Sequence, residues 1–326
     1  MVNRLALVVI ASSALAGCGW SQPSLVSSMA STTMRSIPLA GPVPPRVGPV
    51  AAVSTWMEPS SKGKTLLYIS DVYGNVVWVL NYPKLTPAGV LTGFDQPESL
   101  CTDSRGDVWV TATLDSELVE YAHGSKSPKA TLLEKNQYPS DCSVDPNSGD
   151  LAVANIVSGA GSSAGDVAVF KHAAGKPKIY RDGAFDRVFF LSYDDNGTIW
   201  VDGQSSTGSF VYASLKNGHF SNIVLSGGSI DFAGGVDFIH GTITVGDQQG
   251  PSGYSVVYQT TGNAITGSTP LQQSADVANY IVDGTKLLGP DALAENLGFW
   301  SYPAGGNELR GFVYKWNVPL GIALSK

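Results

Sequence analysis

The fold is decided by the stretch PESLCTDSRGDVWV at residues 97–110. It consists of two short runs suited to β-strands, separated by a turn that contains Asp and Gly. The same pattern returns as PSDCSVDPNSGDLAV at residues 139–153 and as FLSYDDNGTIWV at residues 190–201. Weaker copies lie at residues 67–69, 240–245 and 283–288. The chain is therefore built from an internal repeat.

The repeat has the period of a propeller blade. Equivalent apolar residues of the second strand-like run recur every 41 to 48 residues, at Ile69, Val110, Val153, Val201, Val245 and Leu288. Each clear copy continues with two more strand-like runs, such as residues 118–122 and 128–132. Four strands for each unit, joined by Gly, Asn and Asp turns, are typical of propeller blades. The sequence predicts an all-β fold, a six-bladed β-propeller with four-stranded blades.

The first copy lacks the strand that precedes it in the other copies. That strand is found at the C-terminus, where PLGIALS at residues 319–325 aligns without a gap with PESLCTD at residues 97–103. We therefore predict that the C-terminal strand joins the first blade. Such a strand closes the ring and leaves no exposed sheet edge.

Two cysteines lie on the predicted inner strands of neighbouring blades. When the repeats are aligned on Asp103 and Asp145, Cys142 is equivalent to Leu100, so Cys101 and Cys142 are offset by one position. Because side chains alternate between the two faces of a strand, this offset lets the two sulfurs face each other across the blade boundary. The sequence favours a Cys101–Cys142 disulfide, and the alternative is two buried free thiols.

The repeat has the form Pro-x-x-apolar-x-x-Asp-x-x-Gly-(Asp/Asn/Thr)-apolar-aromatic-Val. It resembles the NHL-repeat and SMP-30/gluconolactonase-like propellers, over about residues 60–326. The resemblance implies an architecture more than an activity, because one fold hosts many functions. In the lactonase members of that group, acidic and Asn residues near the starts of the inner strands hold a divalent metal at the channel mouth.

At the matching positions this chain offers three carboxylates, Glu98, Asp141 and Asp276, and no Asn. By resemblance these are the candidate residues for a ligand or for a Ca²⁺ ion at the channel mouth. The other interpretation is that they are solvated carboxylates without an ion. We expect no other cofactor.

The N-terminus has the features of a bacterial lipoprotein. Residues 1–18 contain one basic residue, Arg4, and an apolar run of 11 residues from Leu5 to Leu15, too short to span a bilayer. The segment Leu15-Ala16-Gly17-Cys18 resembles a lipobox, which implies that Cys18 is lipidated after cleavage. The alternative is an ordinary cleaved signal peptide. We expect an exported protein that is anchored by lipid at the cell envelope.

Residues 19–55 are rich in Ser, Pro, Ala and Val and carry almost no charge. This composition favours a flexible tether between the anchor and the propeller at residues 56–326, and the alternative is an ordered arm on the domain. The whole sequence carries a net charge of −7 and only 14% charged residues. It has no basic surface for nucleic acid, and we expect membrane contact only through the lipid anchor.

The sequence contains no convincing catalytic set. The GSSAG segment at residues 161–165 fits the pattern of a nucleophile elbow, but a strand-like run follows it where a helix is needed. We therefore predict a binding, recognition or scaffold module, whose partner is an envelope protein, a glycan or a small molecule. The alternative is a metal-dependent hydrolytic enzyme of the lactonase or lyase kind, with its site at the channel mouth.

Overall fold

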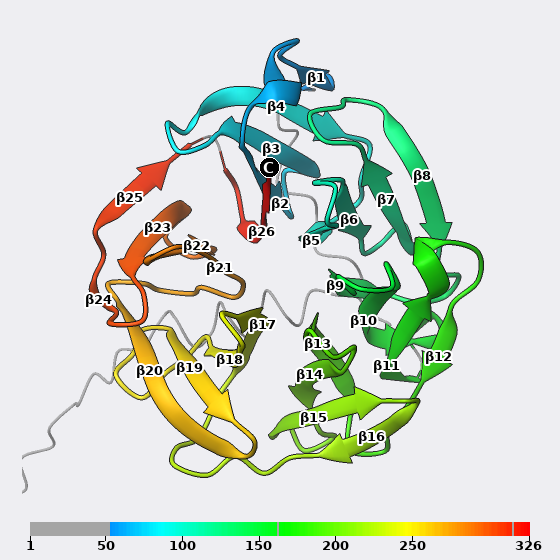
Figure 1. Ribbon diagram of the computed structural model, residues 1–326, viewed down its shortest axis with the longest axis vertical. Coiled ribbons are helices and arrows are strands. Elements are labelled where there is room, and N and C mark those ends of the chain that lie inside the picture. The colour runs from blue at the N-terminus through cyan, green and yellow to red at the C-terminus, as the bar shows by residue number, and fades with distance from the viewer. Residues whose placement is uncertain (1–52, 162, 315) are drawn as a thin grey trace, which may run out of the picture.

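The computed structural model describes residues 53–161, 163–314 and 316–326. Six antiparallel blades surround a central axis and form a β-propeller (Figure 1). The predicted fold class is therefore confirmed. Cys18, the predicted signal peptide and nearly all of the predicted tether lie outside the described residues. In the described part of the chain, no helix is long and apolar enough to cross a bilayer.

The strands of each blade run in order from the inner to the outer edge. Blade 1 consists of β26 (Pro319–Ser325), β2 (Leu66–Asp71), β3 (Val76–Asn81) and β4 (Thr86–Thr92). Blade 2 consists of β5 (Pro97–Thr102), β6 (Val108–Ala112), β7 (Glu117–Tyr121) and β8 (Pro128–Leu133). Blade 3 consists of β9 (Pro139–Val144), β10 (Leu151–Ser158), β11 (Ser163–Phe170) and β12 (Lys178–Tyr180).

The second half of the ring repeats this order. Blade 4 consists of β13 (Arg187–Tyr193), β14 (Ile199–Gln204), β15 (Phe210–Lys216) and β16 (His219–Asn222). Blade 5 consists of β17 (Ala233–Ile239), β18 (Thr242–Asp247), β19 (Val256–Thr261) and β20 (Ala264–Gln272). Blade 6 consists of β21 (Ile281–Asp283), β22 (Lys286–Asp291), β23 (Asn296–Ser301) and β25 (Arg310–Val313).

Two short strands extend this plan. β1 (Trp56–Met57) adds to the outer edge of blade 1, and β24 (Gly306–Asn307) pairs in parallel with β20 of blade 5. Because β24 lies in the connection from β23 to β25, it ties blade 6 to blade 5. Three short 3₁₀ turns, η1 (Ser61–Gly63), η2 (Gly159–Gly161) and η3 (Lys171–Ala173), occur in connections.

The hydrophobic core is divided among the boundaries between blades. All six residues of β2 and of β3 are buried, because each blade is covered on both faces by its neighbours. One cluster joins Tyr68 and Val79 of blade 1 to Leu100 and Val110 of blade 2. A strand that is buried on both faces reads as a continuous apolar run. This explains why the second strand-like run was the clearest element of the repeat.

The repeated aspartate builds the turn between the first two strands of a blade. Asp103 Oδ1 accepts hydrogen bonds from the N–H groups of Arg105 and Asp107, both at 2.9 Å. Asp194 binds its own turn in the same way. The glycine of the turn is required because Gly106 has a φ of +80°, which residues with a Cβ adopt only with strain. The turn chemistry therefore explains the Asp-x-x-Gly signature.

The C-terminal strand closes the ring, as predicted. β26 pairs antiparallel with β2, from Leu66 opposite Ser325 to Ile69 opposite Ile322. Figure 1 shows the last strand at the inner edge of blade 1, beside the first strands of the propeller. The two ends of the domain are thereby held in one sheet.

The predicted disulfide is confirmed. Cys101 of β5 and Cys142 of β9 are bonded to each other, with their Cα atoms 5.6 Å apart. The bond links the inner strands of blades 2 and 3, which is the relationship that the one-position offset implied. It lies in the apolar layer that these two blades share.

Candidate functional site

The inner strands carry a bulge near their starts. In blade 2 the pairing with β6 shifts between Pro97 and Leu100, so Glu98 and Ser99 have no partner in the ladder. Register shifts also occur at this level in blades 1, 3, 4 and 5. A bulge bends the strand and re-aims side chains, and bulges are frequent beside functional sites. Here the bulges bring polar groups of several blades together near the axis.

In blades 1, 2 and 4 the second strand supplies a side chain that accepts a backbone N–H group of the bulge. Ser70 accepts the Gly321 N–H at 2.7 Å, and Thr111 accepts the Ser99 N–H at 2.8 Å. Asp202 holds the equivalent position in blade 4 and accepts the Phe190 N–H at 3.2 Å. In these blades the polar side chain gives a buried backbone N–H group of the bulge the hydrogen-bond acceptor that it needs.

Glu98 is the first of the predicted site residues. Its side chain lies beside the axis with the residue only 8% exposed, and its carboxyl has no hydrogen-bond or ion-pair partner among the described residues. Burial, and then the negative charge of Asp141, raise the pKa of Glu98 to about 8. The neighbouring blades cover most of this residue.

Asp141 lies next to Glu98 and is held by two blades. Ser99 of blade 2 donates to its Oδ1 at 2.6 Å, and the Leu191 N–H of blade 4 donates to its Oδ2 at 3.0 Å. Burial raises the pKa of Asp141 to about 7, although these hydrogen bonds oppose the shift. The residue is 4% exposed. Glu98 and Asp141 therefore form a coupled pair of buried acids.

Sequence reasoning missed two further acids in this place, Asp202 and Asp237. Burial raises the pKa of Asp202 well above its ordinary value, and Asp141 adds to the shift. Burial raises the pKa of Asp237 to about 6, against hydrogen bonds from the Phe238 N–H and Ser192. Asp202 could have been found from its position, since it follows the strand-like run IWV that the repeat defines. We call Glu98, Asp141, Asp202 and Asp237 the central acids.

Asp276 does not belong with the central acids. It is buried, and its pKa is raised to about 7 by burial and then by the charge of Asp291, its neighbour within blade 6. Asp291 accepts the Asp276 N–H at 3.0 Å. The structure therefore brings Glu98 and Asp141 together, and it places Asp276 in a separate acid pair.

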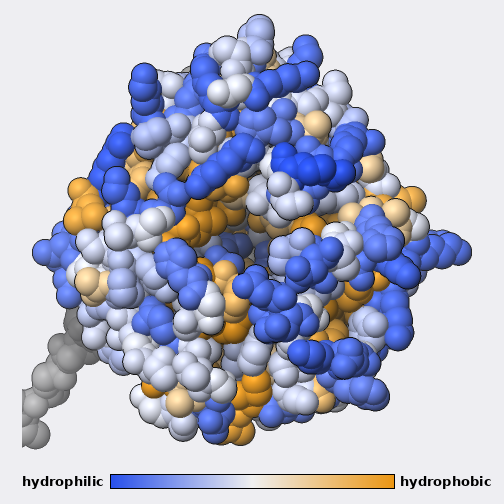
Figure 2. All heavy atoms as spheres, in the orientation of Figure 1, coloured by the Kyte–Doolittle hydropathy of each residue, from blue (hydrophilic) through white to orange (hydrophobic). Residues whose placement is uncertain are grey.

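A polar chain crosses the axis beside the central acids. Asn279, in the segment that leads into blade 6, donates from Nδ2 to Ser99 Oγ of blade 2 at 3.0 Å. The next residue, Tyr280, donates to Thr244 Oγ1 of blade 5 at 2.8 Å. The face seen in Figure 2 is hollowed at its centre, and apolar residues form part of the wall. The middle of the ring thus combines an apolar rim with buried polar groups.

No cation neutralises the central acids in the described part of the chain. None of the ion pairs found there includes any of the four residues. A buried carboxylate without a counter-charge is costly, so such groups either hold a proton or meet a cation. The central acids can therefore exchange protons near neutral pH or bind a positively charged group.

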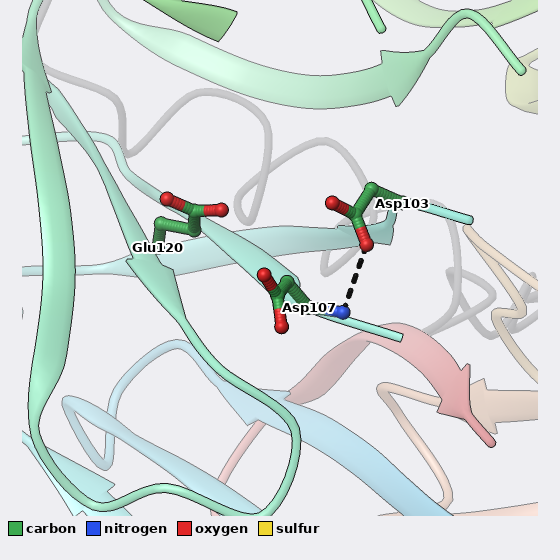
Figure 3. A group of neighbouring side chains, drawn as sticks. All are labelled: Asp103, Asp107 and Glu120. Carbon is green, nitrogen blue, oxygen red and sulfur yellow. Dashed lines mark hydrogen bonds between the residues drawn. The ribbon is translucent and has the colours of Figure 1, made fainter. Parts of the chain in front are cut away.

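The closest gathering of carboxylates lies elsewhere, at the other end of β5 (Figure 3). Ligand atoms of Asp103, Asp107 and Glu120 all lie within 4.8 Å of one another, and in the described residues no other three His, Cys, Asp or Glu side chains do so. Two cations already pair with this group. Lys129 Nζ lies 2.6 Å from Asp107 and 2.7 Å from Glu120, and the Arg105 guanidinium lies 2.6 Å from Asp103. We interpret it as a surface ion-pair network.

The three carboxylates for which the resemblance implied a metal do not gather in this way. Glu98, Asp141 and Asp276 do not gather their ligand atoms within 4.8 Å, since Asp276 faces Asp291 instead. A Ca²⁺ ion takes six to eight oxygen ligands at short range. The three carboxylates by themselves would supply only part of such a shell, and only two of them lie together.

Solved structures are similar to this chain in fold. A chain of the nidogen/laminin complex superposes with a TM-score of 0.64 at 11% identity, covering 80% of this chain and 98% of that one. A protein of unknown function from Bacteroides caccae gives 0.62 at 12% identity, over 81% and 99%. Streptogramin B lyase gives 0.55 at 11% identity, over 82% and 89%. At these identities the similarity shows the propeller fold and nothing finer.

No protein-family model matches the sequence, and no curated protein matches it. The three structural neighbours include a lyase and a chain from a binding complex. The fold therefore fits both a binding role and a catalytic role.

Proposed function

We propose that the protein is a binding module of the bacterial cell envelope, anchored by lipid at Cys18 and carried on the tether of residues 19–55. In this proposal the propeller receives a positively charged group of its ligand at the central acids. An ammonium or guanidinium group could come from an envelope protein, an amino sugar of a glycan or a small amine. The chemistry of recognition is the same for all three.

The observation that carries the proposal is the state of Glu98. The residue is 8% exposed beside Asp141, and its carboxyl has neither a hydrogen-bond donor nor a cation among the described residues. Ionising it without a partner would cost free energy, and a ligand cation would remove that cost. An organic cation suits the arrangement better than a bare metal ion, because its several N–H donors can reach carboxylates that do not converge on one point.

The first experiment is a calorimetric titration of the mature chain with spermidine and arginine amide as probes, both of which keep a positive charge at pH 9. We expect at least one of them to bind more tightly at pH 9 than at pH 6, because deprotonation of Glu98 and Asp141 supplies the negative charge. The Glu98→Gln variant should lose most of this binding. Asp195→Asn, which removes an exposed carboxyl of blade 4, is the matched control and should bind as the native chain does. Binding that ignores both pH and Glu98→Gln would contradict the proposal.

A second candidate is an enzyme of the lactonase or lyase kind. It is favoured by the pKa values of Glu98 and Asp141, about 8 and about 7, which lie where a general acid or base works at neutral pH. Turnover of simple lactones or of streptogramin-type cyclic esters, lost in both Glu98→Gln and Asp141→Asn, would support this candidate. Turnover that both variants retain would exclude the central acids as its site.

The anchor is tested separately from the ligand. We expect the native protein in the membrane fraction of the cells that produce it, and the Cys18→Ser variant in the soluble fraction. Mass spectrometry of the N-terminal peptide should find acyl chains on Cys18. A native protein that is secreted without acyl chains would favour the ordinary signal peptide.

A further inference from the structure

A second group of buried polar side chains lies at the boundary between blades 2 and 3, away from the central acids. Glu134 follows the outer strand β8 of blade 2, and Gln137 lies in the connection that leads to β9. Asn155 of β10 and Asp166 of β11 are cross-strand partners in blade 3. All four residues are buried, with Glu134 2% and Asn155 0% exposed.

Asp166 organises this group. Its Oδ1 accepts from Asn155 Nδ2 at 2.9 Å and from Gln137 Nε2 at 3.1 Å. Its Oδ2 accepts from the Arg181 guanidinium at 2.6 Å. An ionised carboxylate only accepts hydrogen bonds, so each amide must present its nitrogen to Asp166. The orientation of both amides is thereby fixed, and their oxygens face away from Asp166.

This arrangement leaves four buried oxygen atoms without a hydrogen-bond partner: Glu134 Oε1, Glu134 Oε2, Gln137 Oε1 and Asn155 Oδ1. The side chains that carry them are neighbours. The side chains of Gln137 and Asn155 both donate to one oxygen of Asp166. The backbone N–H of Gln137 donates to the backbone carbonyl of Glu134 at 2.8 Å. Burial raises the pKa of the Glu134 carboxyl, the nearby Asn155 side chain lowers it, and the charge of Asp166 raises it further, so these three side chains lie close together. Four unpaired acceptors in one buried place are uncommon in folded proteins.

Blade 1 leaves no such deficit at the matching position. Asn155 pairs with Pro139 as Asp71 pairs with Pro319. Asp71 is fully used, because it accepts the N–H groups of Asn317 and Val318 at 2.9 and 3.0 Å. In blade 3 the corresponding N–H groups of Gln137 and Tyr138 are bound instead by the carbonyls of Glu134 and Val157. The unpaired oxygens at the boundary between blades 2 and 3 are therefore not required by the blade plan itself.

We propose that Glu134, Gln137 and Asn155 form a Ca²⁺ site, with Asp166 holding the two amides in place. A carboxylate and two amide carbonyls are hard oxygen donors, and together they supply four of the six to eight oxygens that Ca²⁺ takes. The charge agrees with this assignment. Arg181 is paired with Asp166, and no ion pair of the described residues includes Glu134. Burial raises the pKa of Glu134 to about 8, so a bound cation would replace the proton that this carboxyl otherwise holds at neutral pH.

A single water molecule or a proton would satisfy fewer of the unpaired oxygens than Ca²⁺ would. A single water molecule donates only two hydrogen bonds, and a proton on Glu134 donates one, whereas four acceptors are unpaired.

The test measures the thermal unfolding of the full chain after treatment with a chelator, with and without added CaCl₂. We expect saturating Ca²⁺ to raise Tm by roughly 5 °C, with a Kd on the order of 10⁻⁵ to 10⁻³ M by calorimetry. In Glu134→Gln the Ca²⁺ effect should disappear, while Tm without Ca²⁺ stays equal or rises, because the new amide can donate to the unpaired oxygens. A merely structural Glu134 would not give this pair of results.

Two more variants make the test selective. Glu98→Gln removes a central acid and should keep the full Ca²⁺ effect. Asn155→Asp adds a carboxylate, so it should be less stable without Ca²⁺ and show a larger shift with it. The proposal is overturned if the native chain shows no Ca²⁺ effect, or if the effect survives in Glu134→Gln. It is equally overturned if the effect is lost in Glu98→Gln alone, which would place the ion at the central acids.

Discussion

Asn279 donates a hydrogen bond to Ser99 over 3.0 Å, although 180 residues separate them in the chain. Ser99 in turn donates to Asp141 at 2.6 Å. The first contact reaches from the entry of blade 6 to blade 2, and the second continues to blade 3. The polar centre of the ring is therefore made by residues from blades that are not adjacent in sequence. Its geometry depends on a closed ring and on the ionisation of the buried acids.

Ring closure can be tested at Gly321 of β26. A Cβ at this position would lie 2.5 Å from the Glu98 carbonyl oxygen and 2.8 Å from Ser70 Oγ, too close for either to remain in place. We expect Gly321→Ala to lower the free energy of unfolding by about 1–3 kcal/mol, as overpacking does, in urea denaturation. Gly63→Ala is the control, since a Cβ there meets nothing within 4 Å. Equal stability of the two variants would show that β26 tolerates displacement.

The disulfide should contribute to stability through the unfolded chain. It closes a loop with a sequence separation of 41 residues. For a loop of this length the chain-entropy model predicts a loss of about 4 kcal/mol when both cysteines are replaced. Denaturation of the Cys101→Ala/Cys142→Ala variant would measure it. Native protein in a reducing agent should unfold like the variant, and a variant as stable as the oxidised native chain would refute this prediction.

Stability should fall as the pH rises through the neutral range. The pKa of Glu98 is raised to about 8 in the folded state, so the folded chain keeps a proton that the unfolded chain releases above its ordinary value near 4.5. The stabilisation that this proton provides is fully present below pH 4.5 and is lost as pH rises toward 8. Thermal unfolding between pH 5 and 9 measures the decline. Glu98→Gln should show a flatter profile and unfold at a higher temperature than the native chain at pH 9, whereas Asp195→Asn should follow the native profile.

Asp202 replaces the hydroxyl residue that blades 1 and 2 use at this position. Ser70 Oγ accepts the Gly321 N–H of the bulge in blade 1 and donates to the backbone carbonyl of Glu98 at 2.7 Å. Asp202 Oδ2, in contrast, is buried without a hydrogen-bond partner. We expect Asp202→Thr to restore the donor and to be at least as stable as the native chain, most clearly at pH 9. Asp202→Ala loses the acceptor for the Phe190 N–H and should be destabilised by about 1–3 kcal/mol. If threonine and alanine destabilise equally, the position does not work as its equivalents do.

The repeat could be predicted because each part of it is a local physical requirement. Asp103 and Gly106 shape one turn by themselves, and the apolar run around Val110 is buried in every blade for the same reason. The pairing of Cys101 with Cys142 followed from the alternation of side chains along two strands in known relation. The repeat period and the alternation of side chains along a strand were therefore sufficient to predict the fold, the ring closure and the disulfide.

The site was predicted only in part. Glu98 and Asp141 were found because the resemblance directs attention to the starts of the inner strands, and the structure places them together. Asp276 was predicted on the same basis but faces Asp291. Asp202 follows a run that the repeat defines, and Asp237 comes from another strand position. No local pattern shows that the two side chains approach Asp141.

The sequence by itself determined the all-β class, the six blades, the strand that closes the ring and the disulfide, because these depend on neighbours along the chain and on a repeat period. Only the tertiary structure decided which acids are buried together, that Asn279 meets Ser99 across the axis, and that the oxygens of Glu134, Gln137 and Asn155 are left unpaired. The physical reason is that burial and charge coupling arise between side chains from different blades. Their distances are set only when the ring closes.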